Sequence, residues 1–142
     1  MNTDFNVIAP SPDPPPSFGV RLAYPTHVFD NVTNDKADQD ILSMSADFYS
    51  HSVKSLFGIN VAASGFRLDA GVLGIEVLVN NRRIGRCEVY AYPEKHQSVN
   101  SRTFYLFGLE EGSKHTIQLK GEDGCHFDGN SRINVSIIEF QA

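Results

Sequence analysis

The chain has 142 residues, of which 41% are hydrophobic and 20% are charged, proportions typical of one globular domain. A domain of this length buries about 70% of the surface that its unfolded chain exposes, so a core can form without metals or disulfides. The formal net charge of −5 argues against nucleic acid as a partner, because phosphate binding needs a basic surface.

The N-terminal segment is dominated by proline. Residues 10–17 read PSPDPPPS and hold five of the seven prolines, a composition that favours extended polyproline II and cannot donate to a sheet ladder. We therefore predict a proline-rich arm or linker over residues 1–17 and a single β-sandwich domain over residues 18–142. A short peripheral strand is expected just before the prolines, at Phe5, Val7 and Ile8.

Residues 18–63 favour strands separated by one long polar stretch. Residues 18–24 predict a strand, and residues 31–44 predict a loop with a helical turn around residues 38–42. A further strand is expected at residues 45–51. The residues after it alternate between apolar and polar, which is the pattern of a half-buried strand. The predicted inward face of that strand carries Val53, Phe57, Ile59, Val61 and Ala63.

The next stretch, GIEVLVNNRRIG, predicts a hairpin over residues 74–85. Asn80 and Asn81 tolerate the positive φ of a tight reversal. The first strand of the hairpin points Ile75, Val77 and Val79 inward. The returning strand ends at Pro93 and places Cys87, Val89 and Ala91 on one face and Glu88, Tyr90 and Tyr92 on the other.

The stretch RTFYLFGLEEGSKHTIQLKG predicts two strands joined by a tight turn, over residues 102–121. The second strand alternates cleanly, but the first is apolar on both faces, with Phe104 and Leu106 opposite Tyr105 and Phe107. The closing strand, residues 132–140, loses its alternation near its end, which predicts a β-bulge at residues 138–140. Eight to ten short strands in all predict an all-β fold, an antiparallel β-sandwich.

Tyr105 and Phe107 need a cover on the second face of their strand. Each aromatic side chain is worth about 1.5–3 kcal/mol when it leaves water. Leaving both exposed would create an adhesive patch. Sister subunits are one cover, and a loop or the N-terminal arm of the same chain is another. We predict an oligomer interface at Tyr105 and Phe107.

Three stretches carry a family resemblance: GIEVLVNNRRIG, FYLFGLEEGSKHTIQLKG and the closing INVSIIEF. Over residues 43–142 the chain resembles the jelly-roll domains of the tumour necrosis factor and complement globular-head superfamily, especially bacterial and phage members that cap fibres. The resemblance implies a jelly roll and a homotrimer, the threefold axis bringing three copies of each exposed aromatic together. The sequence pattern of the second stretch also occurs in galactose-binding-like sandwiches. A monomeric carbohydrate-binding module is therefore the alternative.

No catalytic motif is present in the sequence. It has no nucleophile elbow, no zinc-protease motif and no phosphate loop, so we expect neither an enzyme nor a cofactor. The loop GEDGCHFDGNS at residues 121–131 offers carboxylate and amide oxygens suited to calcium. Its spacing is not that of an EF-hand, and Asp and Asn side chains that form turns explain it as well, so no metal site is predicted. Cys87 and Cys125 either pair or remain buried thiols.

The expected ligand contacts gather in two loops, around residues 93–100 and 121–131. Tyrosine is a frequent contact residue in recognition surfaces, and Asp and Asn hydrogen-bond to hydroxyl groups. The predicted ligand-binding residues are Tyr90, Tyr92, His96, Asp123, His126, Asp128 and Asn130.

These observations predict a non-enzymatic recognition or capping module. It would be a lectin-like, trimeric jelly roll that attaches a fibre, virion or phage tail to a cell-surface glycan or protein receptor. The N-terminus lacks the basic start and apolar run of a signal peptide, so an extracellular or virion-surface location would be reached by another route. No run of about 18 apolar residues exists, so membrane insertion is not expected.

Overall fold

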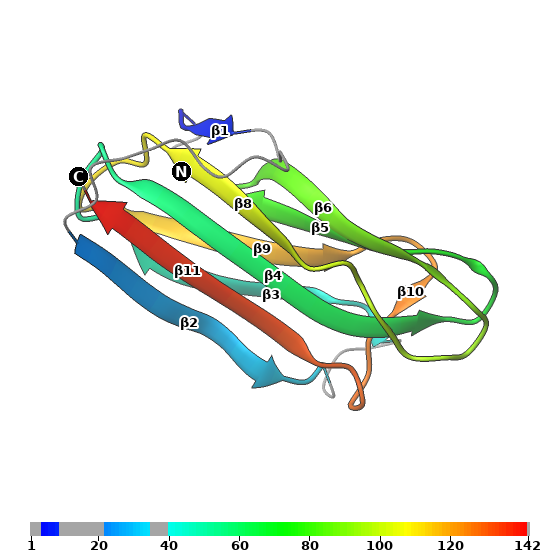
Figure 1. The fold of residues 1–142 in the computed structure, drawn as a ribbon. Helices are drawn as coiled ribbons and strands as arrows, with labels where there is room; N and C mark the ends of the chain where they lie inside the picture. The colour runs from blue at the N-terminus through cyan, green and yellow to red at the C-terminus, as the bar shows by residue number, and fades with distance from the viewer. Residues whose placement is uncertain (1–3, 9–21, 35–39, 142) are drawn as a thin grey trace.

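The computed structural model describes residues 4–8, 22–34 and 40–141. These residues form two antiparallel β-sheets packed face to face, with no α-helix among them (Figure 1). In this described part, therefore, no helix is long and apolar enough to cross a membrane. The predicted all-β antiparallel sandwich is confirmed.

One sheet has seven strands and the other has four. The path of the first is β1 (Asn6–Ile8), β8 (Arg102–Phe107), β4 (Leu56–Arg67), β11 (Ile133–Gln141) and β2 (Leu22–Val32). Two short strands pair with the far part of β4, namely β7 (Gln97–Ser98) and β10 (Cys125–His126). The second sheet runs in the order β3 (Ser43–Tyr49), β9 (Lys114–Gly121), β5 (Gly71–Val79) and β6 (Arg82–Ala91).

The eight longer strands pair as a nested set. The first pairs with the last (β2 with β11), the second with the seventh (β3 with β9), the third with the sixth (β4 with β8) and the fourth with the fifth (β5 with β6). Such nesting is what results when one long hairpin is rolled into two sheets, and it is the jelly-roll arrangement. The predicted jelly roll is thus the observed topology.

The core lies between the two sheets and is built mainly from alternate residues of β4, β5, β8, β9 and β11. The predicted inward positions of β4, β5 and β9 are buried, and Val53, which precedes β4, is exposed. Asn80 and Asn81 have φ values of 51° and 66°, as expected for the tight turn between β5 and β6. The Asn80 carboxamide accepts the Thr116 N–H (3.0 Å) and lies 3.0 Å from Nδ1 of His115, which ties this turn to β9.

The predicted hairpin over residues 102–121 is wrong. Strand β8 lies in the seven-stranded sheet beside β4, whereas β9 lies in the other sheet between β3 and β5. Residues 108–113 bridge the gap of about 10 Å between stacked sheets. Gly108 and Gly112 adopt positive φ in this arch, and Leu109 between them is buried. The segment is therefore a crossover between sheets.

The predicted bulge at residues 138–140 is also wrong. Strand β11 pairs with β4 without interruption from Ile133 to Phe140, and the irregular register with β2 lies earlier, around Val135. The alternation continues because Glu139 takes the inward position after Ile137 and is only 3% exposed. Ile138 and Phe140 point outward, beside Tyr105 and Phe107 in the sheet.

The N-terminal strand was expected and is observed. Strand β1 extends the seven-stranded sheet by pairing with β8, and Phe5, next to it, is buried in the core. Residues 9–21, including the polyproline run and the predicted boundary at residue 18, lie outside the described residues, as do residues 38 and 39 of the helical turn expected at residues 38–42. Cys87 and Cys125 are both buried and free.

The close approach of β6 to the opposite sheet gives a stability test. A methyl group at Gly85 would overlap the ring of Phe104, which is itself fully buried. Gly85→Ala should lower the free energy of unfolding by about 1–3 kcal/mol, measured by urea denaturation. In a Phe104→Leu background the same change should cost less, because the overlapping ring is absent. Equal costs in both backgrounds would contradict this packing. Lys120→Ala, on an exposed position of β9, is the control.

Candidate functional site

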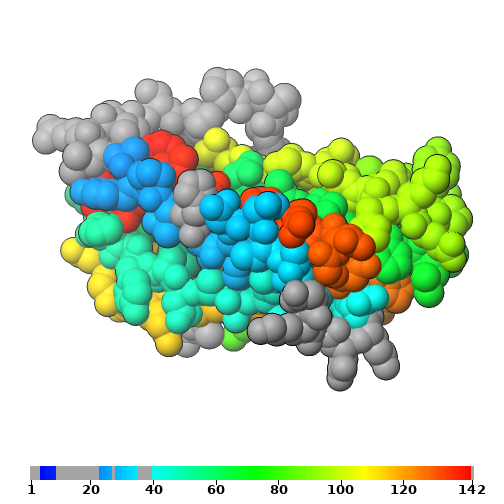
Figure 2. Space-filling view, turned by 90° about the horizontal axis from the view of Figure 1, so that it is seen from below, coloured from blue at the N-terminus to red at the C-terminus, as the bar shows by residue number. Residues whose placement is uncertain are grey.

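The two loops predicted to bind a ligand lie at the same end of the sandwich. In Figure 2 the orange segment around residues 121–131 lies next to the yellow-green segment around residues 90–100. They are joined by a contact between Nε2 of His96 and Oδ1 of Asp128 (2.9 Å). The rings of His96 and His126 both pack on Phe66, with centroids 4.8 Å and 5.2 Å away. The structure therefore brings His96, His126 and Asp128 together on one aromatic residue.

Asp128 organises the second loop. Its Oδ1 accepts the backbone N–H of Asn130 (2.9 Å) and the hydroxyl of Ser131 (3.4 Å), and its own N–H donates to Oγ of Ser131. Burial alone would raise the pKa of the Asp128 carboxyl. The hydrogen bonds from His96, Asn130 and Ser131 outweigh it and lower that pKa below its ordinary value of 3.8. The loop thus uses its carboxylate to make a turn.

Among the described residues, no three His, Cys, Asp or Glu side chains are grouped so that they could hold a metal ion. Asp123 is exposed and has no hydrogen bond to His96 or Asp128. Its backbone oxygen accepts from the Arg67 guanidinium and from the Cys125 thiol. Asp123 and His126 line a separate hollow of about 260 Å³. Asn130 is exposed and contributes its backbone N–H to the turn.

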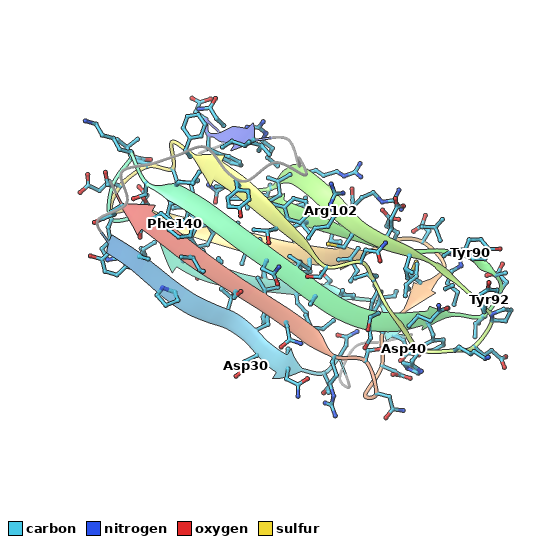
Figure 3. The ribbon with its side chains drawn as sticks, in the orientation of Figure 1. Asp30, Asp40, Tyr90, Tyr92, Arg102 and Phe140 are labelled. Atoms are coloured by element: carbon cyan, nitrogen blue, oxygen red, sulfur yellow. The ribbon has the colours of Figure 1, made fainter. Side chains whose placement is uncertain are left out.

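Tyr90 and Tyr92 form an aromatic pair on the same end of the molecule (Figure 3). They are 58% and 61% exposed, and their ring centroids are 5.9 Å apart in an edge-to-face arrangement. Gln97 anchors the backbone that carries them, since its side chain accepts the N–H of Tyr92 (2.8 Å) and donates to the backbone oxygen of Tyr90 (3.4 Å). Exposed Val72 is directly opposite Tyr90 in β5. We call Val72, Tyr90 and Tyr92 the tip patch.

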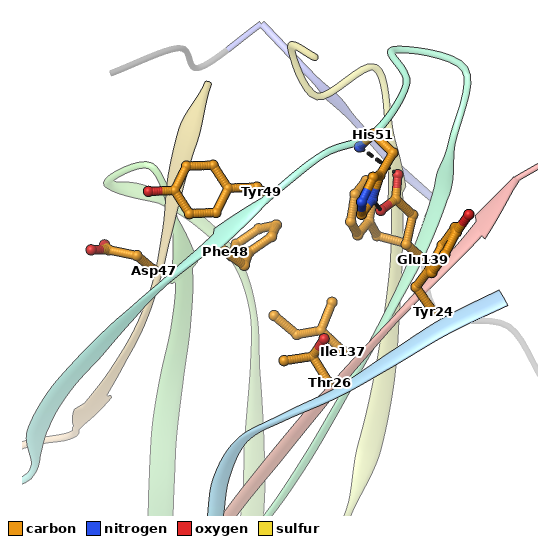
Figure 4. Close-up of a pocket in the computed structure, with 9 residues that line it drawn as sticks. Tyr24, Thr26, Asp47, Phe48, Tyr49, His51, Ile137 and Glu139 are labelled. Carbon is orange, nitrogen blue, oxygen red and sulfur yellow. Dashed lines mark hydrogen bonds and ion pairs between the residues drawn. The ribbon is translucent and has the colours of Figure 1, made fainter. Parts of the chain in front are cut away.

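A cleft of about 350 Å³ opens between the free edges of the two sheets, where β2 and β3 face each other (Figure 4). Figure 2 views this side of the molecule, with β2 in blue next to β3 in teal. Sequence analysis did not identify this cleft. The one local signal for it is Glu139, a carboxylate at the inward position of an otherwise apolar strand. The lining residues are Tyr24, Thr26, Asp47, Phe48, Tyr49, His51, Phe57, Ile137 and Glu139.

Glu139 is the hub of the polar contacts in this cleft. Its Oε2 accepts the hydroxyl of Ser55 (2.6 Å) and the backbone N–H of His51 (2.8 Å). Its Oε1 lies 2.6 Å from Nδ1 of His51. The His51 ring stacks on Tyr24, with centroids 4.7 Å apart and planes inclined by 20°. Glu139 thereby fixes the orientation of the imidazole at the mouth of the cleft.

The outer surface of the seven-stranded sheet carries the predicted interface residues. Tyr105 is half-buried and Phe107 is 38% exposed. The strand register places Tyr105 in one row with outward-facing Ile138, and Phe107 in the next row with outward-facing Phe140. Leu56 lies between Phe107 and Phe140 in that second row. We call these five residues the outer aromatic face. Gly58 leaves room for the Tyr105 ring, which would be 3.3 Å from an added Cβ.

Comparisons with solved structures found similar folds at low sequence identity. A crystal structure of dimeric latent PorU from Porphyromonas gingivalis has a TM-score of 0.57 at 8% identity; the match covers 84% of this chain and only 12% of PorU. The baseplate tripod of bacteriophage Tuc2009 has a TM-score of 0.49 at 12% identity, covering 96% of this chain and 80% of that one.

A family 35 carbohydrate-binding module from Clostridium thermocellum follows, with a TM-score of 0.39 at 6% identity over 82% of this chain and 90% of the module. No protein-family model and no curated protein matches the chain. The likeness to PorU shows the fold alone, and the resemblance to the tumour necrosis factor superfamily stays a prediction.

The lowered pKa of Asp128 makes a prediction about pH. A carboxyl whose pKa is lower in the folded state stabilises the fold above about pH 3.8, and that stability is lost as the pH falls through the lowered pKa. Asp128→Asn should therefore reduce the free energy of unfolding at about pH 6, and the difference from the parent should shrink below about pH 3.8. Urea unfolding across this range measures it. Exposed Asp123→Asn is the control, and identical behaviour of the two variants would contradict the assignment.

Proposed function

We propose that this chain is a non-enzymatic recognition module that binds a glycan on a cell surface through the tip patch, as part of an extracellular fibre or virion such as a phage tail. The observation that carries the proposal is the pair of tyrosines, each more than half exposed, with their rings in edge-to-face contact and their backbone anchored by Gln97. Exposed aromatic groups that are fixed in place lose little entropy when they bind, and they offer both an apolar face and a hydroxyl group.

The surroundings of the tip patch support a polar ligand. The loops that carry His96, Asp128 and Asn130 lie at the same end of the sandwich (Figures 1 and 2). Such side-chain groups donate to and accept from hydroxyls, while the tyrosine rings cover the apolar face of a sugar. A protein receptor could bind to the same groups. Experiment must therefore decide between a glycan and a protein as the ligand.

The arrangement of polar groups supports binding in place of catalysis. The nearest approach to a catalytic set is Ser55, Glu139 and His51. Here the carboxylate lies between the hydroxyl and the imidazole, whereas a nucleophilic triad needs the imidazole between the other two. Burial raises the pKa of the Cys87 thiol and outweighs the opposing effect of Arg102, which makes Cys87 a poor nucleophile at neutral pH.

The proposal extends to a homotrimer that associates through the outer aromatic face. A sheet surface with several apolar side chains in adjacent rows favours association, because water leaves each of them when it is covered. Three copies around an axis would bury Phe107, the most exposed member. A monomer with the same glycan specificity would instead favour the galactose-binding-like alternative.

Loss of the tyrosine pair should abolish recognition. Tyr90→Ala with Tyr92→Ala should weaken binding to the responding glycan at least about tenfold, because each aromatic contact is worth about 0.5–1.5 kcal/mol beyond its buried area. A glycan array followed by titration calorimetry measures this. Val53→Ala, also on an exposed apolar residue, is the control. Unchanged glycan binding by the double variant would place the recognition surface elsewhere, and an array without any response would favour a protein receptor.

The assembly proposal is tested by mass in solution. Light scattering should give about three times the chain mass of 15.7 kDa. Tyr105→Asp with Phe107→Asp should release folded monomers, because six carboxylates would meet at the trimer axis. Tyr90→Asp with Tyr92→Asp, at the tip patch, should leave the mass unchanged. A monomeric parent chain, or a trimer that survives the first pair of substitutions, would contradict the proposed interface.

A further inference from the structure

The cleft between β2 and β3 is a second candidate site, and it lies toward the end of the sandwich away from the tip patch, near Phe140 (Figures 3 and 4). We propose that this cleft binds one uncharged pyranose ring. The inference is independent of the recognition surface proposed above, because the two sites share no residue.

The cleft exists because two edge strands face each other without pairing. The inward positions of β2 carry Tyr24 and Thr26, opposite Glu139 and Ile137 of β11. Both side chains remain exposed, so β2 does not close this part of the gap between the sheets. The floor is apolar and buried, formed by Phe48, Phe57 and Ile137. The result is an apolar floor with polar groups on its walls, the usual composition of a small-molecule site.

Glu139 sets which groups are left for a ligand. Its two oxygens are engaged by the Ser55 hydroxyl, by the backbone N–H of His51 and by Nδ1 of the His51 ring. Glu139 therefore has little capacity for a further hydrogen bond. An ionised carboxylate only accepts, so the proton of a neutral His51 ring lies on Nδ1. Nε2 is then an acceptor, and no hydrogen bond joins it to a described residue. Glu139 is a positioning residue, and His51 is the contact.

Charge around the cleft excludes an anionic ligand. The titratable groups that line it are Asp47, Glu139 and His51, and no Lys or Arg is among the described residues of the lining. Lys114, which is outside the lining, lies 3.9 Å from Oδ2 of Asp47 in an exposed pair. A phosphate, a uronic acid or a sialic acid would therefore approach Asp47 and Glu139 with no Lys or Arg in the lining to compensate its charge.

Size and chemistry together select a pyranose. A volume of about 350 Å³ is at the small end of ligand sites. A purely apolar occupant would leave the Thr26 hydroxyl and the His51 Nε2 without partners, which is costly once water is displaced. A sugar ring satisfies both requirements. Its C–H face covers Phe48 and the stacked Tyr24–His51 pair, while its hydroxyls donate to Nε2 of His51 and bond to Oγ1 of Thr26.

The test is an NMR titration of the full chain with D-glucose, D-galactose, D-mannose and N-acetyl-D-glucosamine. At least one sugar should shift the amide signals of Thr26, Phe48 and His51 saturably, with a dissociation constant on the order of 1 mM. Glucuronate and N-acetylneuraminate should bind at least tenfold more weakly. Thr26→Val keeps the shape of the side chain, removes its hydroxyl, and should weaken sugar binding about fivefold to tenfold. His51→Phe, which keeps the stack on Tyr24, should do the same.

The outcomes separate this inference from the recognition surface at the tip patch. Thr103→Val removes a hydroxyl from the outer side of β8 and should leave cleft binding unchanged. The proposal is overturned if no neutral sugar saturates the cleft signals, if the acidic sugars bind as tightly, or if Thr26→Val has no effect while its unliganded spectrum shows a native fold. Shifts confined to Tyr90 and Tyr92 would also overturn it, while supporting glycan recognition at the tip patch.

Discussion

Contact between the inner faces of the two sheets is the constraint on which the rest of this molecule depends. Most of the long strands contribute buried residues to that contact, and a methyl group at Gly85 would overlap the Phe104 ring where β6 passes it. The outward positions are thereby free to vary. The cleft lies where β2 and β3 leave the edges of the two sheets open.

Buried polar groups mark the places where this packing is interrupted. Asn80 and His115 are fully buried and bond to each other and to backbone groups of neighbouring turns, so they fasten the β5–β6 turn to β9. Glu139 is equally buried but bonds to side-chain and backbone groups of the segment that leads into β4. The first network closes one region of the core. The Glu139 network instead lines the cleft between β2 and β3, because it holds the His51 imidazole at the cleft surface.

Local patterns predicted most inward residues, because alternation in a strand depends only on which face meets the core. The Asn80-Asn81 turn was predictable for a similar reason, since its backbone geometry is local. Strand partners were not: β8 and β9 look like a hairpin, yet the glycines of the arch at residues 108–113 carry the chain to the other sheet.

The same distinction applies to the candidate sites. The convergence of the loops around His96 and Asp128 follows from both being connections of one sandwich. The cleft depends on the absence of pairing between the edge strands β2 and β3. A local stretch of sequence does not reveal which strands lie at the edges of the sheets. Glu139 was mistaken for a break in alternation because a carboxylate at an inward position contradicts the expected apolar pattern, and its partners His51 and Ser55 are far away in sequence.

The nested strand pairing has a consequence for how the chain reaches its fold. Leu22 at the start of β2 pairs with Gln141 at the end of β11, so the outermost pair joins almost the whole length of the chain. Such distant contacts are slow to form, whereas the β5–β6 hairpin is local and can form early. During synthesis, β2 and β3 therefore emerge long before their partners β11 and β9 do. Their backbone N–H and C=O groups stay without these strand partners until β9 and β11 have also been synthesised.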